Sequence, residues 1–537
     1  MAEQADLAGL VASYLDLRWQ FDPVAATVAG LDDYDERLGS YTPEDVRLHI
    51  VALRSLASAL EQAPVDSLEE EIDRTALLND VRVTIHRFTK ERPHLTDPGF
   101  WLSHALEGLY YLLALHDRPQ EHRARAARHR LEALPTFLEA GEETLEEVPQ
   151  VFVDIAAETV QGGRLLLDQL GEHLRPADDP AFDAALDAAR ASVQAFGRYL
   201  AGDLGAATNG SYAIGEDAFN FRLHYEHAVR DTAPELWRYG THLVEEVERD
   251  LVGLAREIDG SAQWQDLVDR LRAEHPSAGE LVGAYAVEME RARGFVAAHD
   301  LVSIPSGRLD VIETPTFLRP MMPFAAYQPP GPFSLDRTGR FFVTPPDPGA
   351  APETSERILR DHCVHELAAT ALHEGFPGHH LQFLTAQAQP QPVRRLIGTA
   401  LTIEGWALYC EEMMGEEGFY RGPEERFFQR VHLLWRALRI LLDVGLHTRG
   451  MTFDEAVQLL VDRVHFDRRN AEVEVRRYCA NPAYQLCYAV GRRELRDLRD
   501  AYRAARGNDY SLRGFHDAVL RYGGLPLSLT RWGLGLE

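Results

Sequence analysis

Two short stretches of the chain carry the residue types of a hydrolytic metal site. Residues 371–383, ALHEGFPGHHLQF, contain the pair His373-Glu374, and residues 403–412, IEGWALYCEE, contain Glu404. Neutral imidazoles and a carboxylate hold zinc in hydrolytic sites, where a further carboxylate takes a proton from the attacking water. We therefore interpret His373 and Glu404 as candidate metal ligands and Glu374 as the candidate general base.

The second histidine ligand has two candidates, His379 and His380. On a straight helix, His379 would be rotated by about 240° from His373, and His380 would lie on the same face but roughly 10 Å further along. Pro377 and Gly378 stand between them, and proline followed by glycine predicts a kink. We expect this kink to bring one of the two histidines to the metal. The competing interpretation is that the histidines only cap a kinked helix.

Further carboxyl and hydroxyl groups are expected around the ligands. Glu411 follows Glu404 by seven residues, which is two helical turns, so it is placed to accept a hydrogen bond from a ligand histidine. Tyr484 and Tyr488 are four apart, and a tyrosine hydroxyl can stabilise the oxyanion formed in acyl transfer. Tyr488 is the preferred catalytic candidate, although either tyrosine could be a core aromatic.

Arg477 is the candidate substrate-binding residue. A planar guanidinium binds a carboxylate through two hydrogen bonds, so Arg477 could hold a carboxylate of the substrate. The alternative, which we favour, is a structural ion pair with Glu474 or Glu411.

These residues belong to a chain whose pattern is mainly helical. Apolar residues recur at intervals of three and four in 7–19, 46–62, 100–115 and 236–258. Residues 301–350 are instead rich in Pro, Gly and aromatics, with short β-like runs at 310–313 and 340–344. We predict a mainly α fold, a large multi-helix body around a deep cleft, with a small irregular β segment near 301–345. The helical regions 1–300 and 351–537 flank the segment 301–350, and the three are expected to form one continuous unit.

Composition excludes several classes of partner. The net charge of −29 argues against nucleic acid and against anionic membrane surfaces. The four cysteines form no CxxC pair, and no run of about 18 apolar residues predicts a membrane span. Residues 1–20 lack the pattern of a signal peptide. We therefore expect a cytoplasmic protein with a small-molecule or peptide substrate; the oligomeric state is left open.

Several longer blocks give the chain a family resemblance. HEGFPGHHLQ, EGWALYCEE, RALRILLDVGLH (436–447), EVRRY (474–478), NPAYQLCYAVG (481–491) and FHDAVLRYGGLPL (515–527) resemble the signature blocks of the DUF885 family of bacterial proteins. The opening DPVAATVAGLDDYDERL (22–38) resembles that family as well, so the likeness runs almost end to end. The resemblance implies a mostly helical, zinc-dependent protein.

The motif pair is also similar to the gluzincin metallopeptidases of the thimet oligopeptidase and Taq carboxypeptidase type. Those proteins use HExxH, then a glutamate about 25 residues later that opens a helix with another glutamate seven positions on. Glu404 and Glu411 match that pattern, and His379 stands 25 residues before Glu404. By this similarity His379 is the first candidate for the second ligand, with two residues inserted after the His-Glu pair, and His380 is the alternative.

The residues and the resemblance together lead to one favoured hypothesis. The chain is expected to be a zinc-dependent hydrolase with one zinc ion per chain, and a metallopeptidase acting on short peptides is preferred. Two alternatives remain: a metal-dependent amide or ester hydrolase acting on a small molecule, and a non-catalytic binding protein with a degenerate metal site.

Overall fold

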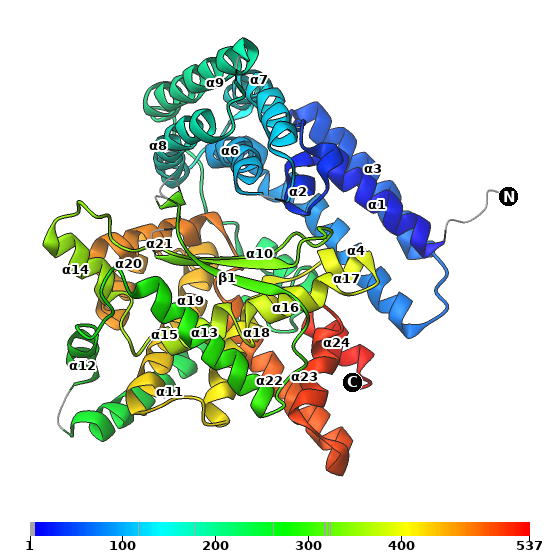
Figure 1. Cartoon of the computed structure of the whole chain (residues 1–537). Coiled ribbons are helices and arrows are strands. Elements are labelled where there is room, and N and C mark those ends of the chain that lie inside the picture. Colours follow the sequence, from blue (N-terminus) through cyan, green and yellow to red (C-terminus); the bar gives the residue numbers. More distant parts are fainter. Residues whose placement is uncertain are drawn as a thin grey trace. The chain divides into compact units, whose positions relative to one another are not determined.

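The computed structural model describes residues 6–536 apart from 116, 178, 261–262, 316–317, 320–321 and 323. These residues are mainly helical with one small sheet, which confirms the predicted fold class (Figure 1). The chain divides into two compact units, residues 1–214 with 331–336, and residues 215–330 with 337–537. The division after Ile214 falls inside the helical region 1–300 expected from the sequence. The deep cleft remains a prediction.

The first unit is built of helices only, as far as its residues are described. Its α-helices are α1 (Leu7–Phe21), α2 (Pro23–Val28), α3 (Pro43–Gln62), α4 (Leu68–His86), α5 (Pro93–Thr96), α6 (Pro98–Ala114), α7 (Gln120–Thr144), α8 (Gln150–His173) and α9 (Pro180–Tyr199). Short 3-10 or π turns lie at Asp32–Tyr34, Arg87–Glu91 and Leu200–Leu204. Thr42 caps α3 by accepting a hydrogen bond from the N–H of Asp45, and Pro43 begins the helix, as the sequence pattern predicts.

The second unit contains every candidate site residue. Its first helices are α10 (Glu216–Tyr225), α11 (Ala233–Asp259), α12 (Trp264–Leu271) and α13 (Leu281–Ala298). After the strands come α14 (Pro352–Arg360), α15 (Leu367–Glu374), α16 (His379–Gln387), α17 (Pro392–Leu396), α18 (Ala400–Glu416), α19 (Pro423–Thr448), α20 (Phe453–Val464), α21 (Arg468–Ala480), α22 (Cys487–Arg506), the 3-10 turn Gly507–Asp509, α23 (Leu512–Leu520) and α24 (Leu527–Gly533).

The small sheet has three strands in the order β1-β3-β2. The central strand β3 (Thr338–Val343) pairs in parallel with β1 (Arg308–Glu313) and antiparallel with β2 (Ala325–Gln328). Phe341 and Val343 of β3 are buried against residues of α13 and of the first turns of α15, among them Tyr285 and Leu367. The sheet therefore packs on the helix that ends in His373-Glu374. The β-like runs at 310–313 and 340–344 predicted β1 and β3, whereas β2 was not predicted.

Two glycines let α18 and α22 pack with their backbones in contact. A Cβ atom built on Gly405 would lie 2.5 Å from the Cα of Gly491, and one on Gly491 would lie 2.0 Å from the carbonyl oxygen of Leu401. Any larger residue would force the two helices apart. This close approach brings Tyr488 in the first turn of α22, and Tyr484 in the turn before it, to the helix that carries Glu404.

Candidate metal centre

A tight turn separates His373 from the two histidines that follow it, His379 and His380. Helix α15 ends at Glu374 and α16 begins at His379, so the predicted kink is a complete break between two helices. The peptide bond between Phe376 and Pro377 is cis, and the Pro377 carbonyl accepts a hydrogen bond of 2.8 Å from the Trp406 indole. A Cβ on Gly378 would lie 1.9 Å from the His373 carbonyl oxygen, so only glycine fits this turn.

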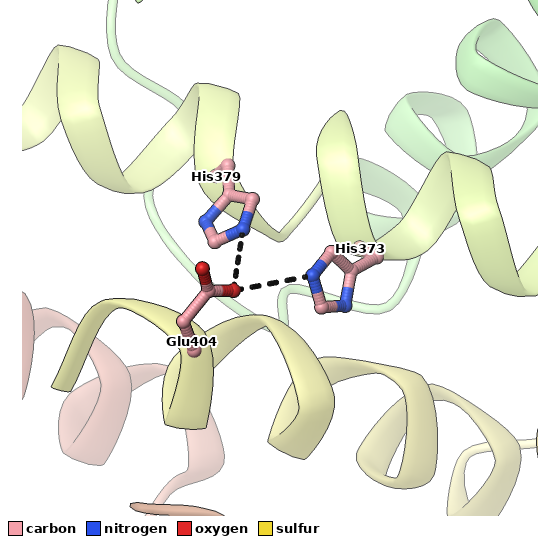
Figure 2. A group of neighbouring side chains, drawn as sticks. All are labelled: His373, His379 and Glu404. Carbon is pink, nitrogen blue, oxygen red and sulfur yellow. Dashed lines mark ion pairs between the residues drawn. The ribbon is translucent and has the colours of Figure 1, made fainter. Parts of the chain in front are cut away.

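The break brings His379 to the same carboxylate as His373. Figure 2 shows the two imidazoles converging from the ends of adjacent helices on Glu404 of α18. The Oε2 atom of Glu404 lies 3.3 Å from Nε2 of His379 and 3.6 Å from Nε2 of His373. Two ligands bound at roughly 2.0–2.1 Å in a tetrahedral zinc site lie about 3.4 Å apart. The two distances from Glu404 therefore fit a zinc ion.

Glu411 orients His373 toward the other two residues. Its Oε1 atom lies 2.8 Å from Nδ1 of His373, which leaves Nε2 facing Glu404. Burial alone would lower the pKa of His373, but its bonds to Glu404 and Glu411 outweigh burial and raise the pKa to about 9. A carboxylate on the far nitrogen of a ligand histidine is the arrangement expected around a bound metal.

Tyr484 holds the other oxygen of Glu404. Its hydroxyl donates a hydrogen bond of 2.6 Å to Oε1, so Oε2 alone faces the two histidines. Glu404 is buried, and in the described part of the chain no lysine or arginine lies within ion-pair distance of it. A buried carboxylate needs a compensating charge. Two imidazoles and this carboxylate form the three-residue donor set of hydrolytic zinc sites, so the residues fit the metal.

Glu374 stands beside the cluster without a partner of its own. It is half-buried at the end of α15, and its charge raises the pKa of His373 and of Tyr327 in β2. Among the described residues it makes no hydrogen bond or ion pair. A carboxylate in this position is available to accept a proton.

Tyr488 lies against His373 rather than on Glu404. The two rings are nearly parallel, with centroids 6.3 Å apart. Its hydroxyl has no hydrogen-bond partner in the described part of the structure, and burial first, then the charge of Glu404, raises its pKa to about 12. The hydroxyl therefore stays protonated at neutral pH and is free to donate.

His380 points away from the cluster, toward the sheet. Its Nδ1 atom lies 3.0 Å from the hydroxyl of Tyr327, and burial lowers its pKa to about 4. Gly339 of β3 leaves room for this pair, because a Cβ there would lie 2.4 Å from the Tyr327 hydroxyl oxygen and 2.6 Å from Nδ1 of His380. Of the two adjacent histidines, the structure thus places only His379 with His373 and Glu404.

No described hydrogen bond, ion pair or ring contact joins Arg477 to the cluster, although its positive charge opposes the effect of burial and lowers the pKa of Tyr488. Its side chain on α21 is about half exposed and forms an ion pair with Glu474 at 3.4 Å. The sequence interpretation missed two other arginines, Arg436 and Arg439 of α19, whose Cζ atoms lie 5.7 and 4.8 Å from the centroid of the Tyr488 ring. Their signal was present, since both interrupt a long apolar helical run.

Fold and cluster together define a mainly helical protein with a buried His-His-Glu group. The chain matches the DUF885 family, described as "Bacterial protein of unknown function", over residues 23–532, and it belongs to that family. No curated protein sequence matches the chain.

Two solved structures share the fold over almost the whole chain. One, from Shewanella oneidensis, is described as a "putative lipoprotein of unknown function"; it is 23% identical, with a TM-score of 0.83, over 99% of this chain and 100% of that chain. The other, described as a "putative lipoprotein" from Colwellia psychrerythraea, is 17% identical with the same TM-score, over 99% of both chains. At these identities the likeness establishes the fold.

The expected cytoplasmic location is contradicted by these descriptions. Both similar structures are called lipoproteins, and a lipoprotein is held at a membrane by its lipid instead of being free in the cytoplasm. The sequence argument weighed apolar spans, net charge and the pattern of residues 1–20, and neither apolar spans nor net charge reports lipid attachment. None of the described helices is long and apolar enough to cross a membrane.

Proposed function

We propose that this protein is a zinc-dependent hydrolase, and that its substrates are short peptides. The observation that carries the proposal is the convergence of His373, His379 and Glu404 on one point, with the unpaired carboxylate of Glu374 beside it. The same His-Glu-His-Glu order, with a helix that opens on one glutamate and carries another seven residues on, supports similarity to the gluzincin metallopeptidases.

Each residue of the cluster has a distinct task in this proposal. When bound, zinc polarises the scissile carbonyl and lowers the pKa of a coordinated water toward neutrality. His373, His379 and Glu404 hold the ion, and Glu411 keeps Nε2 of His373 directed at it.

Glu374 and Tyr488 supply the remaining chemistry. Glu374 takes a proton from the attacking water and returns it to the leaving amine, which its unpaired carboxylate permits. The Tyr488 hydroxyl donates a hydrogen bond to the oxyanion that forms as the carbonyl is attacked. Tyr484 already donates to Glu404, so its task is to hold that ligand.

Replacing Glu374 with Gln tests the proposal, because the amide keeps the shape and loses the basicity. The variant should bind zinc like the wild type, measured by elemental mass spectrometry, and should lose at least about 100-fold in kcat on a library of short peptides. Glu417→Gln, at an exposed glutamate just beyond α18, is the matched control and should leave turnover unchanged.

The outcomes separate the three functional hypotheses. Peptide cleavage that disappears in the Glu374→Gln protein supports the peptidase. Cleavage of small amides or esters with no peptide turnover favours the small-molecule hydrolase. Wild-type protein that binds zinc and turns over neither class of substrate is a binding protein, and the proposed chemistry then fails.

A further inference from the structure

His227 joins two backbone segments that both lead to Glu404. It lies just after α10 and is 1% exposed. Its Nε2 atom lies 2.9 Å from the carbonyl oxygen of Ala483, and its Nδ1 atom is hydrogen-bonded to the Thr399 hydroxyl. Thr399 is the N-cap of α18, the helix that carries Glu404. Ala483 directly precedes Tyr484, whose hydroxyl donates to Glu404.

The hydrogen bonds of this imidazole are fully determined by its surroundings. Burial lowers the pKa of His227, so the ring is neutral at pH 7, with one nitrogen that donates and one that accepts. A carbonyl oxygen only accepts, so Nε2 donates to Ala483 and Nδ1 accepts from the hydroxyl of Thr399. The Thr399 oxygen in turn accepts from the N–H of Leu401 at 3.3 Å, in the first turn of α18. His227 therefore bridges two positions of the backbone.

One end of this bridge holds a strained residue. Ala483 is buried with a φ of 59°, in the left-handed region that residues other than glycine rarely adopt. Its N–H donates to Asp443 of α19 at 2.9 Å, and its carbonyl oxygen accepts from His227. The thiol of Cys487 also donates to this carbonyl, at 3.4 Å, but a thiol is a weak donor. Strained conformations persist where the surroundings fix them, and here His227 supplies the stronger of these two bonds to the carbonyl.

The contacts close a ring of chain segments and hydrogen bonds around Glu404. From Thr399 the ring follows α18 to Glu404, whose Oε1 atom accepts from the Tyr484 hydroxyl at 2.6 Å. From Tyr484 it passes to Ala483 and returns to Thr399 through His227. Every other member of this ring lies on α18, at its N-cap or in residues 481–486, which we call the Tyr484 turn. The imidazole therefore sets how the Tyr484 turn lies against α18.

We propose that His227 is a positioning residue of the metal centre; this rests on the zinc site proposed above. By tying the Tyr484 turn to the start of α18, it keeps the Tyr484 hydroxyl on Oε1 of Glu404 and leaves Oε2 for the ion. Groups that orient a metal ligand change metal affinity by about 10- to 100-fold when they are removed. Since His227 acts through Tyr484, its loss should weaken zinc binding by about 10-fold, as is expected for loss of the Tyr484 hydroxyl.

A double-mutant cycle tests whether His227 acts through Tyr484. His227→Gln, Tyr484→Phe and the double variant would be compared by zinc competition with a chromophoric chelator. Glutamine can place a donor where Nε2 stood but has no acceptor in place of Nδ1, so the link to Thr399 is lost. Each single variant should weaken zinc affinity by about 10-fold, and the double variant by about 10-fold as well. An additive loss of about 100-fold in the double variant would overturn the proposal.

Cys487 provides the matched control, because its Sγ atom contacts the same imidazole and the same carbonyl, at 3.6 and 3.4 Å. Cys487→Ala leaves the link to Thr399 intact and should bind zinc like the wild type. A loss equal to that of His227→Gln would refute the proposal.

The other end of the bridge gives a second route if His227→Gln does not fold. Thr399→Val removes the hydroxyl and keeps the shape of the side chain, so it should reproduce the 10-fold loss, whereas Thr399→Ser should keep full affinity. Full affinity in a folded Thr399→Val protein would also refute the role of His227.

Crystal structures separate this inference from the metal centre, because they need no metal. In His227→Gln, or in Thr399→Val, the Tyr484 hydroxyl should leave hydrogen-bond distance of Oε1 of Glu404. This displacement would support the positioning role even if the wild type bound no zinc, a result that would refute the metal centre alone. A bond kept at 2.6 Å in the variant would overturn the role of His227, whatever the zinc affinities.

Discussion

Replacing Gly378 with alanine should pull His373 and His379, the two candidate ligand histidines, apart. The new Cβ would lie 1.9 Å from the His373 carbonyl oxygen and 2.4 Å from that of Leu372, both of them backbone atoms that cannot rotate away. Such contacts are essentially never below 3.0 Å, so the turn must open by about 1.1 Å. Zinc ligands tolerate only about 0.2 Å of change in their distance from the metal.

The expected effect is large on metal binding and measurable on stability. Zinc affinity should fall by more than about 100-fold, because His379 leaves the reach of an ion held by His373 and Glu404. The overlap should also lower the free energy of unfolding by about 3 kcal/mol or more. Zinc competition with a chromophoric chelator reports the first quantity, and thermal unfolding followed by circular dichroism reports the second.

A glycine in open space gives the matched control. A Cβ on Gly253 of α11 would meet nothing within 4 Å, so Gly253→Ala should raise stability by about 0.5–1 kcal/mol and leave zinc affinity unchanged. The reasoning would be refuted if Gly378→Ala bound zinc as tightly as the Gly253→Ala protein.

Three further predictions follow from the contacts of the site and of the turn that precedes α22. Tyr488→Phe should lower kcat by about 100- to 1,000-fold with zinc content unchanged. Tyr484→Phe should mainly weaken zinc binding, by about 10-fold. If both variants lowered kcat on the same peptide equally, the two tyrosines would not have the separate roles proposed for them. Glu411→Gln should weaken zinc binding about 10- to 100-fold in chelator competition, and unchanged affinity would remove Glu411 from the site. Burial raises the pKa of Asp443, which accepts hydrogen bonds from the N–H groups of Ala483 and Leu486, to about 7. The folded state therefore holds a proton that the unfolded state releases, and stability should fall as the pH rises from about 4 to 7, by at most about 1.4 kcal/mol per unit. Asp443→Asn should flatten this dependence of stability on pH, measured by thermal unfolding. The same slope in the variant and in the wild type would contradict a raised pKa of Asp443.

The helical fold and part of the site were accessible from the sequence because they depend on local rules. Apolar periodicity predicts helices, and the seven-residue spacing of Glu404 and Glu411 places both on one face whatever the tertiary structure. A hydrogen bond from a candidate ligand histidine to Glu411 was predictable for the same reason, and the structure shows that His373 donates it. Strand β2 was missed because it is four residues long and its pairing with β3 is set by distant parts of the chain.

The residues alone left the choice between His379 and His380 open, because it depends on the conformation of a four-residue turn, and only the similarity to the gluzincins favoured His379. Adjacent helical residues point about 100° apart, so a small change where α16 begins would exchange the two rings. The close contact of Gly378 with the His373 carbonyl fixes that starting point. The different contacts of Tyr484, which donates to Glu404, and of Tyr488, which stacks near His373, likewise depend on the close approach of α22 to α18. Gly405 and Gly491 permit this approach.

Zinc content of the wild type, His379→Ala and His380→Ala proteins is the most direct test of the central claim. The three proteins would be loaded with zinc, freed of excess metal and analysed by elemental mass spectrometry, with folding checked by circular dichroism. The proposed metal centre predicts one zinc ion per chain in the wild type and in His380→Ala, and its loss in His379→Ala. Zinc retained by a folded His379→Ala protein, or absent from the wild type, would contradict a metal centre built from His373, His379 and Glu404.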